Sequence, residues 1–309
     1  MKTDLVQIFE VGPRDGLQNE SHLFTLKEKI WFISSLIQAG VRNIEIGAFV
    51  RPDRVPQMAD TDQLCHYFFS APKRLGLAQA WCLVPNKSGL QRALEVGVTH
   101  FAVFTAATET FAKKNIGMTI QQSLKEFQEI LRAARVVLGS KLKVRGYVST
   151  AFGCPFEGKV APKKVLSVIE KLAALGVDQI SIGDTIGVAH PASVQALIQP
   201  ALKMLDRGQI AVHFHDTRGT ALANTLRSID LGIRTIDSSA GGLGGCPYAP
   251  GAAGNLATED LLFMLNGMGM RTGIDLDDFC KVTLKLFRKI KRPLTSRYLQ
   301  TYVAQFGLE

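Results

Sequence analysis

Short apolar, β-branched runs alternate with helix-like segments along this chain, and this alternation restricts its fold more than any other feature. Eight candidate strands occur, at Leu5–Glu10, Asn43–Gly47, Leu77–Leu83, His100–Phe104, Leu142–Val148, Gln179–Gly183, Ile210–His215 and Thr235–Ser239. Helical patterns lie between them, at 26–40, 57–70, 86–97, 119–138, 161–175, 191–206 and 218–231. Such alternation predicts a parallel sheet with crossover helices.

Eight units in roughly 260 residues fit a closed (β/α)8 TIM barrel. We expect residues 1–309 to form a single barrel domain, in which the residues after about 270 form additional packed helices. An open doubly wound sheet is the alternative. It has little support, because no GxGxxG follows the first strand and no GxxxxGK[ST] occurs anywhere.

The charge balance favours anionic partners. Lys and Arg number 36 against 27 Asp and Glu, a formal charge of +9. Basic residues are dense between 271 and 297, which indicates either a solvated helix face or a landing surface for a polyanionic substrate tail. No stretch approaches the roughly 20 apolar residues of a membrane span, so no membrane partner is expected.

The cysteines indicate a reducing compartment. There are five, and no two lie within four residues of each other, so no CxxC redox or zinc pair exists. The odd count and the absence of an apolar signal segment near Met1 favour a cytoplasmic protein.

Polar residues follow the predicted strands at the points where the strands end. In such a barrel the C-terminal strand ends and their loops build the active face, so residues far apart in sequence converge there. The candidates are Arg14 and Asp15 after the first strand, Glu45 on the second, Asp184 after the sixth, His213 and His215 at the end of the seventh, and Cys246 and Asn255 after the eighth.

His213 and His215 are two residues apart on a strand, so alternation puts both on one side, roughly 7 Å apart. With Asp15 and Asn255 they offer two imidazole nitrogens and two oxygens. This set suits Mg²⁺, Mn²⁺, Co²⁺ or Zn²⁺, with positions left for substrate. The HxH pair alone is weak evidence, since a single buried histidine is more often an ordinary core residue.

Six glycines fall within 241–254, together with Pro247 and Pro250. Such a segment cannot form a stable helix or strand, and it is typical of a loop that moves or approaches a ligand closely. Cys246 lies within it. Most lone cysteines are packed apolar residues, but in this loop the thiol can exchange protons if a nearby cation lowers its pKa.

The remaining candidates have two interpretations each. Arg14 beside Asp15 is either a surface ion pair or, directly after the first strand, a stabiliser of a carbonyl oxygen. Glu45 and Asp184 either take part in the chemistry or orient histidines and arginines.

Several motifs resemble those of the 3-hydroxy-3-methylglutaryl-CoA lyases, a family within a wider superfamily of metal-dependent TIM barrels. They are Val11–Glu20, Val55–Asp60, Arg145–Ser149, Gly153–Gly158, Gly183–Gly187, His213–Thr217, Gly242–Tyr248 and Gly254–Asp260. The resemblance covers residues 5 to about 295. The cysteine-bearing glycine loop is the narrow marker, because the first-strand Arg-Asp and the HxHD element are shared across the superfamily.

The resemblance implies a site and a reaction. The divalent cation, Mg²⁺ or Mn²⁺, would be bound by Asp15, His213, His215 and Asn255. The groups involved in the chemistry would be Arg14, which stabilises the enolate oxygen of acetyl-CoA, Cys246 in acid–base chemistry, Glu45 and Asp184 in substrate positioning or proton transfer, and His213. The reaction would split 3-hydroxy-3-methylglutaryl-CoA into acetoacetate and acetyl-CoA.

One segment departs from the family. Ile46–Pro52 replaces a Thr/Ser-Ser-Phe-Val-Ser-Pro run, so lost hydroxyls and an added Arg51 leave a related 3-hydroxyacyl-CoA open as the substrate. The motif starts at residue 11 and no cysteine follows Cys280, which favours a bacterial-type cytoplasmic enzyme.

Two other functions are alternatives. A Claisen-type synthase joining acetyl-CoA to a 2-oxo acid belongs to the same superfamily, and the cysteine in the glycine loop argues against it. A basic barrel that binds nucleic acid lacks interleaved aromatic and basic motifs. We therefore expect an acyl-CoA thioester as partner, no nucleic acid, and a homo-oligomer of two or more copies.

Overall fold

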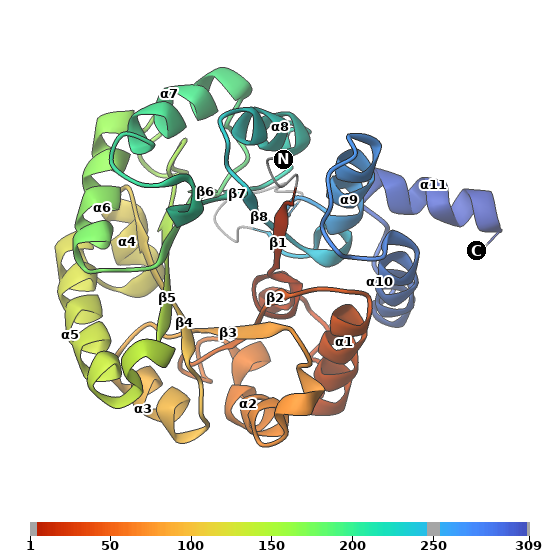
Figure 1. Cartoon of the computed structure of the whole chain (residues 1–309), viewed down its shortest axis with the longest axis horizontal. Coiled ribbons are helices and arrows are strands. Elements are labelled where there is room, and N and C mark those ends of the chain that lie inside the picture. The colour runs from red at the N-terminus through yellow and green to blue at the C-terminus, as the bar shows by residue number, and fades with distance from the viewer. Residues whose placement is uncertain (1–4, 246–253, 308–309) are drawn as a thin grey trace.

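The computed structural model describes residues 5–245 and 254–307, and its centre is a closed barrel of parallel strands (Figure 1). The strands are β1 Gln7–Glu10, β2 Asn43–Ala48, β3 Gln79–Leu83, β4 His100–Ala106, β5 Lys143–Ser149, β6 Gln179–Asp184, β7 Ile210–Phe214 and β8 Thr235–Ser238. Each strand pairs with the next, and β8 pairs with β1. The predicted (β/α)8 barrel is confirmed, and the open sheet is excluded.

All eight predicted strands are present, and none of their ends is shifted by more than two residues. They are easy to recognise in the sequence. Both faces of a parallel sheet are covered by other parts of the protein, and this burial requires nearly continuous apolar runs. Ile44, Val103, Ile182 and Val212 on four of the strands are almost entirely shielded from solvent.

Eight helices surround the barrel between the strands (Figure 1). They are α1 Leu26–Gln38, α2 Thr61–Phe69, α3 Lys87–Glu95, α4 Glu109–Ile116, α5 Ile120–Leu138, α6 Pro162–Ala174, α7 Pro191–Ala201 and α8 Ala221–Asp230. Side-chain capping marks several starts, because Thr25 and Thr119 each form a capping box that satisfies free backbone N–H groups.

Three helix predictions differ from the structure. The predicted helix 191–206 ends already at Ala201, the last residue of α7. The predicted helix 57–70 begins only at Thr61, because Pro56–Met58 forms a separate 3-10 turn. Helix α4 was not predicted. It has only eight residues, of which Phe111 and Ala112 alone are buried, so its apolar periodicity is too short to recognise.

The predicted extra C-terminal helices are present. Within the described residues after the last strand they are α9 Thr258–Gly267, α10 Leu276–Ile290 and α11 Arg297–Phe306. Helix α10 contacts both α1 and α9, and α11 contacts α9, where the Tyr298 ring stacks on Phe263 with centroids 4.9 Å apart. Figure 1 shows α11 extending outward from the ring of helices.

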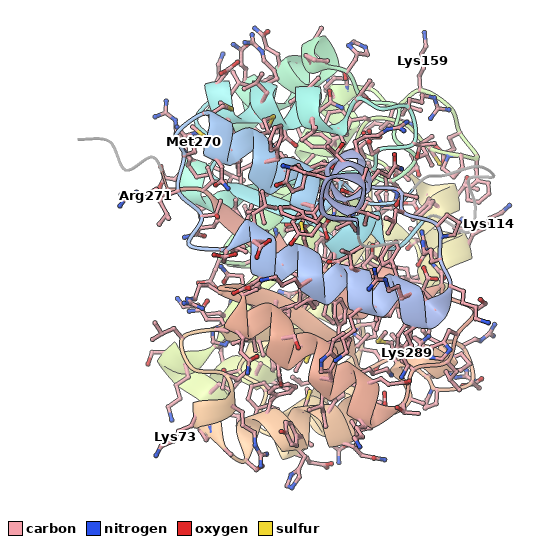
Figure 2. All side chains as sticks on the ribbon, turned by 90° about the vertical axis from the view of Figure 1, so that its right-hand side faces the viewer. Lys73, Lys114, Lys159, Met270, Arg271 and Lys289 are labelled. Carbon is pink, nitrogen blue, oxygen red and sulfur yellow. The ribbon has the colours of Figure 1, made fainter. Side chains whose placement is uncertain are left out.

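The two ends of the barrel differ in what they carry. In the side view of Figure 2, Lys114 on α4 and Lys159 in the loop after β5 lie at one end, and Lys73 and Arg271 lie at the opposite end. The first end is the one at which the strands terminate. No helix in the described part of the chain is long and apolar enough to cross a membrane.

Candidate active site

The loop after β1 is a single π-helical turn, Gly12–Gly16, closed by the backbone N–H of Gly16 donating to Val11 O at 3.1 Å. Both glycines are required by close packing. A Cβ on Gly12 would lie 2.5 Å from Glu10 Oε1, and one on Gly16 would lie 2.8 Å from Ser239 Oγ. The turn therefore fits tightly against the barrel, which fixes the side chains that it carries.

Arg14, on this turn, is 7% exposed and bridges two carboxylates. Its Nε donates to Glu45 Oε2 at 2.7 Å, and its Nη1 donates to Asp15 Oδ1 at 2.7 Å. Burial works to lower the pKa of Arg14, but the charges of Glu45 and Asp15 outweigh it and raise that pKa. Arg14 is thus not a surface ion pair, and it stays a cation in the site.

Glu45, on β2, is fully buried, and only one of its two carboxylate oxygens accepts hydrogen bonds from the described residues. Its Oε2 accepts from Arg14 and, at 3.2 Å, from the Tyr147 hydroxyl, whereas its Oε1 has no hydrogen-bond partner among the described residues. Burial raises the pKa of Glu45 despite the opposing charge of Arg14. A buried carboxylate with a free oxygen and a raised pKa is suited to accept a proton.

Asp15, His213 and His215 each place a potential ligand atom within 4.8 Å of the others. The two histidine rings, whose centroids are 5.3 Å apart, lie on the same side of the chain, as their spacing predicted. Burial works to raise the pKa of Asp15, but Arg14 and both histidines hold it at about 2. Burial and His213 lower the pKa of His215 to about 4. The cluster therefore offers a carboxylate and a neutral imidazole, the forms that bind cations.

Asn255 completes the cluster, and its amide orientation is fixed. The Nδ2 group donates to Asp15 Oδ2 and to Leu243 O, both at 2.9 Å. The amide oxygen, Oδ1, is buried and has no partner in the described ranges, and neither has His215 Nδ1. Buried polar atoms without partners are rare and require an explanation such as a bound ion.

Glycines bring the loop after β8 against this cluster. A Cβ on Gly244, whose φ is +105°, would lie 2.6 Å from Asn255 Nδ2. A Cβ on Gly254, whose φ is +95°, would lie 2.4 Å from Gly242 O and 2.5 Å from Gly244 O. Asn19 Nδ2 holds Gly245 O at 3.0 Å. The described ends of the loop are therefore packed backbone against backbone beside Asn255.

The start of the same loop is held from the C-terminal helices. Thr295 Oγ1, between α10 and α11, donates to Gly241 O at 2.6 Å, and the Gly241 N–H donates to Glu259 Oε2 at 2.8 Å. A Cβ on Gly241 would lie 2.4 Å from the Phe287 ring of α10. The positive φ of +60° at Gly241 adds to this requirement.

Comparison with known proteins identifies the family. Residues 5–285 match the HMGL-like family. The chain belongs to that family. This HMGL-like chain is 44% identical over 292 residues to the hydroxymethylglutaryl-CoA lyase of Pseudomonas mevalonii, covering 94% of this chain and 95% of the relative. It is 46% identical to the cytoplasmic 3-hydroxy-3-methylglutaryl-CoA lyase of Rattus norvegicus, covering 91% and 82% of the two chains.

Solved structures agree. The hydroxymethylglutaryl-CoA lyase of Pseudomonas aeruginosa superposes with a TM-score of 0.92 at 40% identity, covering 98% of this chain and 99% of that one. A lyase of Acinetobacter baumannii, solved in complex with coenzyme A and 3-methylmalate, gives 0.90 at 36% identity, covering 99% and 96%. The resemblance predicted from the motifs is confirmed.

The described contacts do not test the chemical role of two predicted groups of the HMGL-like site. Asp184 is buried at the end of β6, and its carboxylate oxygens accept from the backbone N–H groups of Val188 and Ala189, at 3.0 and 2.9 Å. Asp184 thus fixes its own loop, and its part in the chemistry stays a prediction. Cys246 lies outside the described residues, so its role also stays a prediction.

Three polar residues under the cluster were not predicted as parts of the site. Arg145 Nη1 donates to the Tyr147 hydroxyl at 3.2 Å, and Arg145 Nη2 donates to Asp237 Oδ1 at 2.5 Å. Asp237 Oδ2 lies 3.2 Å from His213 Nδ1. A continuous line of polar contacts therefore runs from Glu45 through these residues to His213. The available signal was Asp237, a carboxylate within the predicted strand Thr235–Ser239.

Proposed function

We propose that this chain is a divalent-metal-dependent lyase that cleaves 3-hydroxy-3-methylglutaryl-CoA into acetoacetate and acetyl-CoA. The observation that carries the proposal is the position of the Asp15–His213–His215 cluster directly beside the Arg14–Glu45 ion pair, in a chain related to hydroxymethylglutaryl-CoA lyases over nearly its whole length. The cluster suits a cation, and the ion pair suits acid–base chemistry and an oxyanion.

The donor set fits Mg²⁺ or Mn²⁺. Asp15 would contribute a carboxylate oxygen, Asn255 its unpartnered Oδ1, and His213 and His215 one imidazole nitrogen each. The carboxylate and amide oxygens suit these cations, although the two imidazoles would also accept Co²⁺ or Zn²⁺, and four protein ligands leave positions for substrate oxygens. A cation bound there would lower the pKa of a coordinating hydroxyl group, as it does for water.

Glu45 is the group we assign to removal of the substrate's hydroxyl proton. Its free Oε1 is buried, and its raised pKa lets it hold a proton once it has accepted one. Asp184 is less suited, because both of its oxygens already accept from backbone N–H groups. Loss of the hydroxyl proton lets the C–O electrons form the ketone of acetoacetate, and the adjacent C–C bond breaks.

Arg14 is the group we assign to the negative charge that the broken bond leaves on the thioester oxygen. It has five N–H donors, and each terminal nitrogen keeps a second N–H beyond those bonded to Glu45 and Asp15. A preorganised cation of this kind stabilises an enolate oxygen without reorganisation. The enolate carbon must then be protonated, and Cys246 on the glycine loop is the donor that we assign.

The test is acetoacetate release from 3-hydroxy-3-methylglutaryl-CoA by the purified protein, with EDTA and with added Mg²⁺ or Mn²⁺. Release that EDTA removes and either cation restores would support the proposal. Good metal binding without acetoacetate release would indicate that the substrate is a related 3-hydroxyacyl-CoA, because Ile46–Pro52 departs from the family sequence. Release of free CoA from acetyl-CoA and a 2-oxo acid would favour the synthase instead.

The proposal also includes the ligand of the enzyme and its location in the cell. The structure of the Acinetobacter baumannii lyase with coenzyme A makes an acyl-CoA thioester the expected ligand, consistent with the +9 charge of this chain. Three of the related lyases are named cytoplasmic, and we infer the same location here. Assembly into a homo-oligomer stays a prediction, testable by light scattering.

A further inference from the structure

We propose that the buried Arg145–Asp237 ion pair sets the tautomer of His213, so that the nitrogen facing the cation carries a lone pair before the cation arrives. Asp237 is a positioning residue in this proposal, since it acts through His213. The inference rests on the proposed cation site for its purpose, but the tautomer can be measured in the metal-free protein.

Each described contact of Asp237 is with a hydrogen-bond donor or with His213. Its Oδ1 accepts from Arg145 Nη2 at 2.5 Å, and its Oδ2 accepts from Ser181 Oγ at 2.8 Å and lies 3.2 Å from His213 Nδ1. A carboxylate only accepts, so the Nδ1 of His213 must carry the proton in this contact. The neutral ring then has its lone pair on Nε2, which is the nitrogen left for a cation.

Arg145 cannot turn away from Asp237. It is fully buried inside the barrel, its guanidinium carbon lies 3.8 Å from the centroid of the Phe9 ring, and its Nε donates to Gln179 Oε1 at 3.1 Å. Because a guanidinium offers only donors, the atom of residue 237 that faces Arg145 must be an acceptor.

This restriction makes Asp237→Asn an informative change. The amide oxygen must face Arg145, which leaves the NH2 group on the side of His213 Nδ1. His213 would then accept at Nδ1 and carry its proton on Nε2, towards the cation. The substitution preserves size and shape but reverses the tautomer.

His215 provides a contrast within the same cluster. Its Nδ1 is buried and has no hydrogen-bond partner in the described parts of the chain. Described contacts therefore preset the tautomer of His213 but not that of His215. The two histidines are not equivalent ligands, although they share a strand end and a spacing of two residues.

The experiment uses metal-free full-length protein labelled with ¹⁵N, and long-range ¹H–¹⁵N NMR of the imidazole rings. His213→Ala identifies the His213 signals among the six histidines. We expect the Nδ1–H tautomer in the wild type and the Nε2–H tautomer in Asp237→Asn. Ser181→Ala is the matched control, because it removes a hydrogen bond to the same Oδ2 without placing a donor there, and it should keep the wild-type tautomer.

Titration with Mn²⁺, followed by electron paramagnetic resonance, is the second readout. Loss of a partner that orients a metal-bound histidine costs about 10–100-fold in metal affinity. We expect that loss for Asp237→Asn and a change of less than about threefold for Ser181→Ala, with circular dichroism spectra matching the wild type. An Nε2–H tautomer in the wild type, or unchanged Mn²⁺ affinity in Asp237→Asn, would overturn the inference. Absence of Mn²⁺ binding in the wild type would instead overturn the proposed cation site.

Should Asp237→Asn fail to fold, the wild-type spectrum still decides the question, since it shows the tautomer directly.

Discussion

Replacing Gly254 with alanine should destabilise the protein and loosen the cation site together. Gly254 has a φ of +95°, and an added Cβ would lie 2.4 and 2.5 Å from the carbonyl oxygens of Gly242 and Gly244. The left-handed backbone costs a side chain about 1–2 kcal/mol. Overpacking against atoms that cannot swing aside adds about 1–3 kcal/mol. The free energy of unfolding should therefore fall by about 2–5 kcal/mol.

Gly97→Ala measures the backbone part of that loss, so the difference between the two variants gives the packing part. Gly97 has a comparable φ of +84°, but the nearest atom to its added Cβ is the Phe69 Cβ at 3.9 Å, an ordinary contact. Urea denaturation should give a loss of only about 1–2 kcal/mol for this control. Mn²⁺ affinity should weaken in Gly254→Ala alone, because Gly254 precedes Asn255. Equal losses in both variants, with unchanged Mn²⁺ affinity, would refute the argument that tight backbone packing positions Asn255.

Three further outcomes are expected. Asp15→Asn should weaken Mn²⁺ binding at least tenfold in a calorimetric titration, because losing a ligand should cost no less than losing a group that merely orients one; a titration curve matching the wild type would remove Asp15 from the ligand set. Cys246→Ser should keep Mn²⁺ binding but lose most turnover, while Cys280→Ser, a buried thiol on α10, keeps both; an unchanged kcat in Cys246→Ser would end the proposed proton-donor role. Burial raises the pKa of Glu10 from 4.5 to about 7, so the folded state binds more protons between those values, and the stability that Glu10 contributes is complete below pH 4.5 and lost as the pH rises through 7. Glu10→Gln should flatten that part of the pH dependence in urea titrations, and an unaltered slope would contradict the assignment.

The barrel and most of the polar cluster were predictable from the sequence, because both depend on local patterns. Apolar runs buried on both faces define the strands, and the two-residue spacing of His213 and His215 places both on one side. The positions of Asp15 and Asn255 beside these histidines were predictable because strand ends converge on one face of a barrel.

The Arg145–Asp237–His213 contacts were not predictable in the same way, since they depend on how β5, β7 and β8 are aligned. His213 pairs in register with Asp237, which is a property of the closed sheet and not of either strand. Helix α4 was missed for a different reason, because eight residues are too few to establish a period.

The contacts of Thr295 and Phe287 with Gly241 have a consequence for protein engineering. The family match ends at residue 285, and the barrel itself is complete at Ser238. A designer who trimmed the chain to its eight repeating units would keep every strand and every assigned ligand up to His215. The trimmed scaffold would nevertheless lose the attachment points of the β8 loop, since these lie in the C-terminal appendage. Grafting this chemistry onto another barrel therefore requires transplanting residues 254–296 as well as the strand ends.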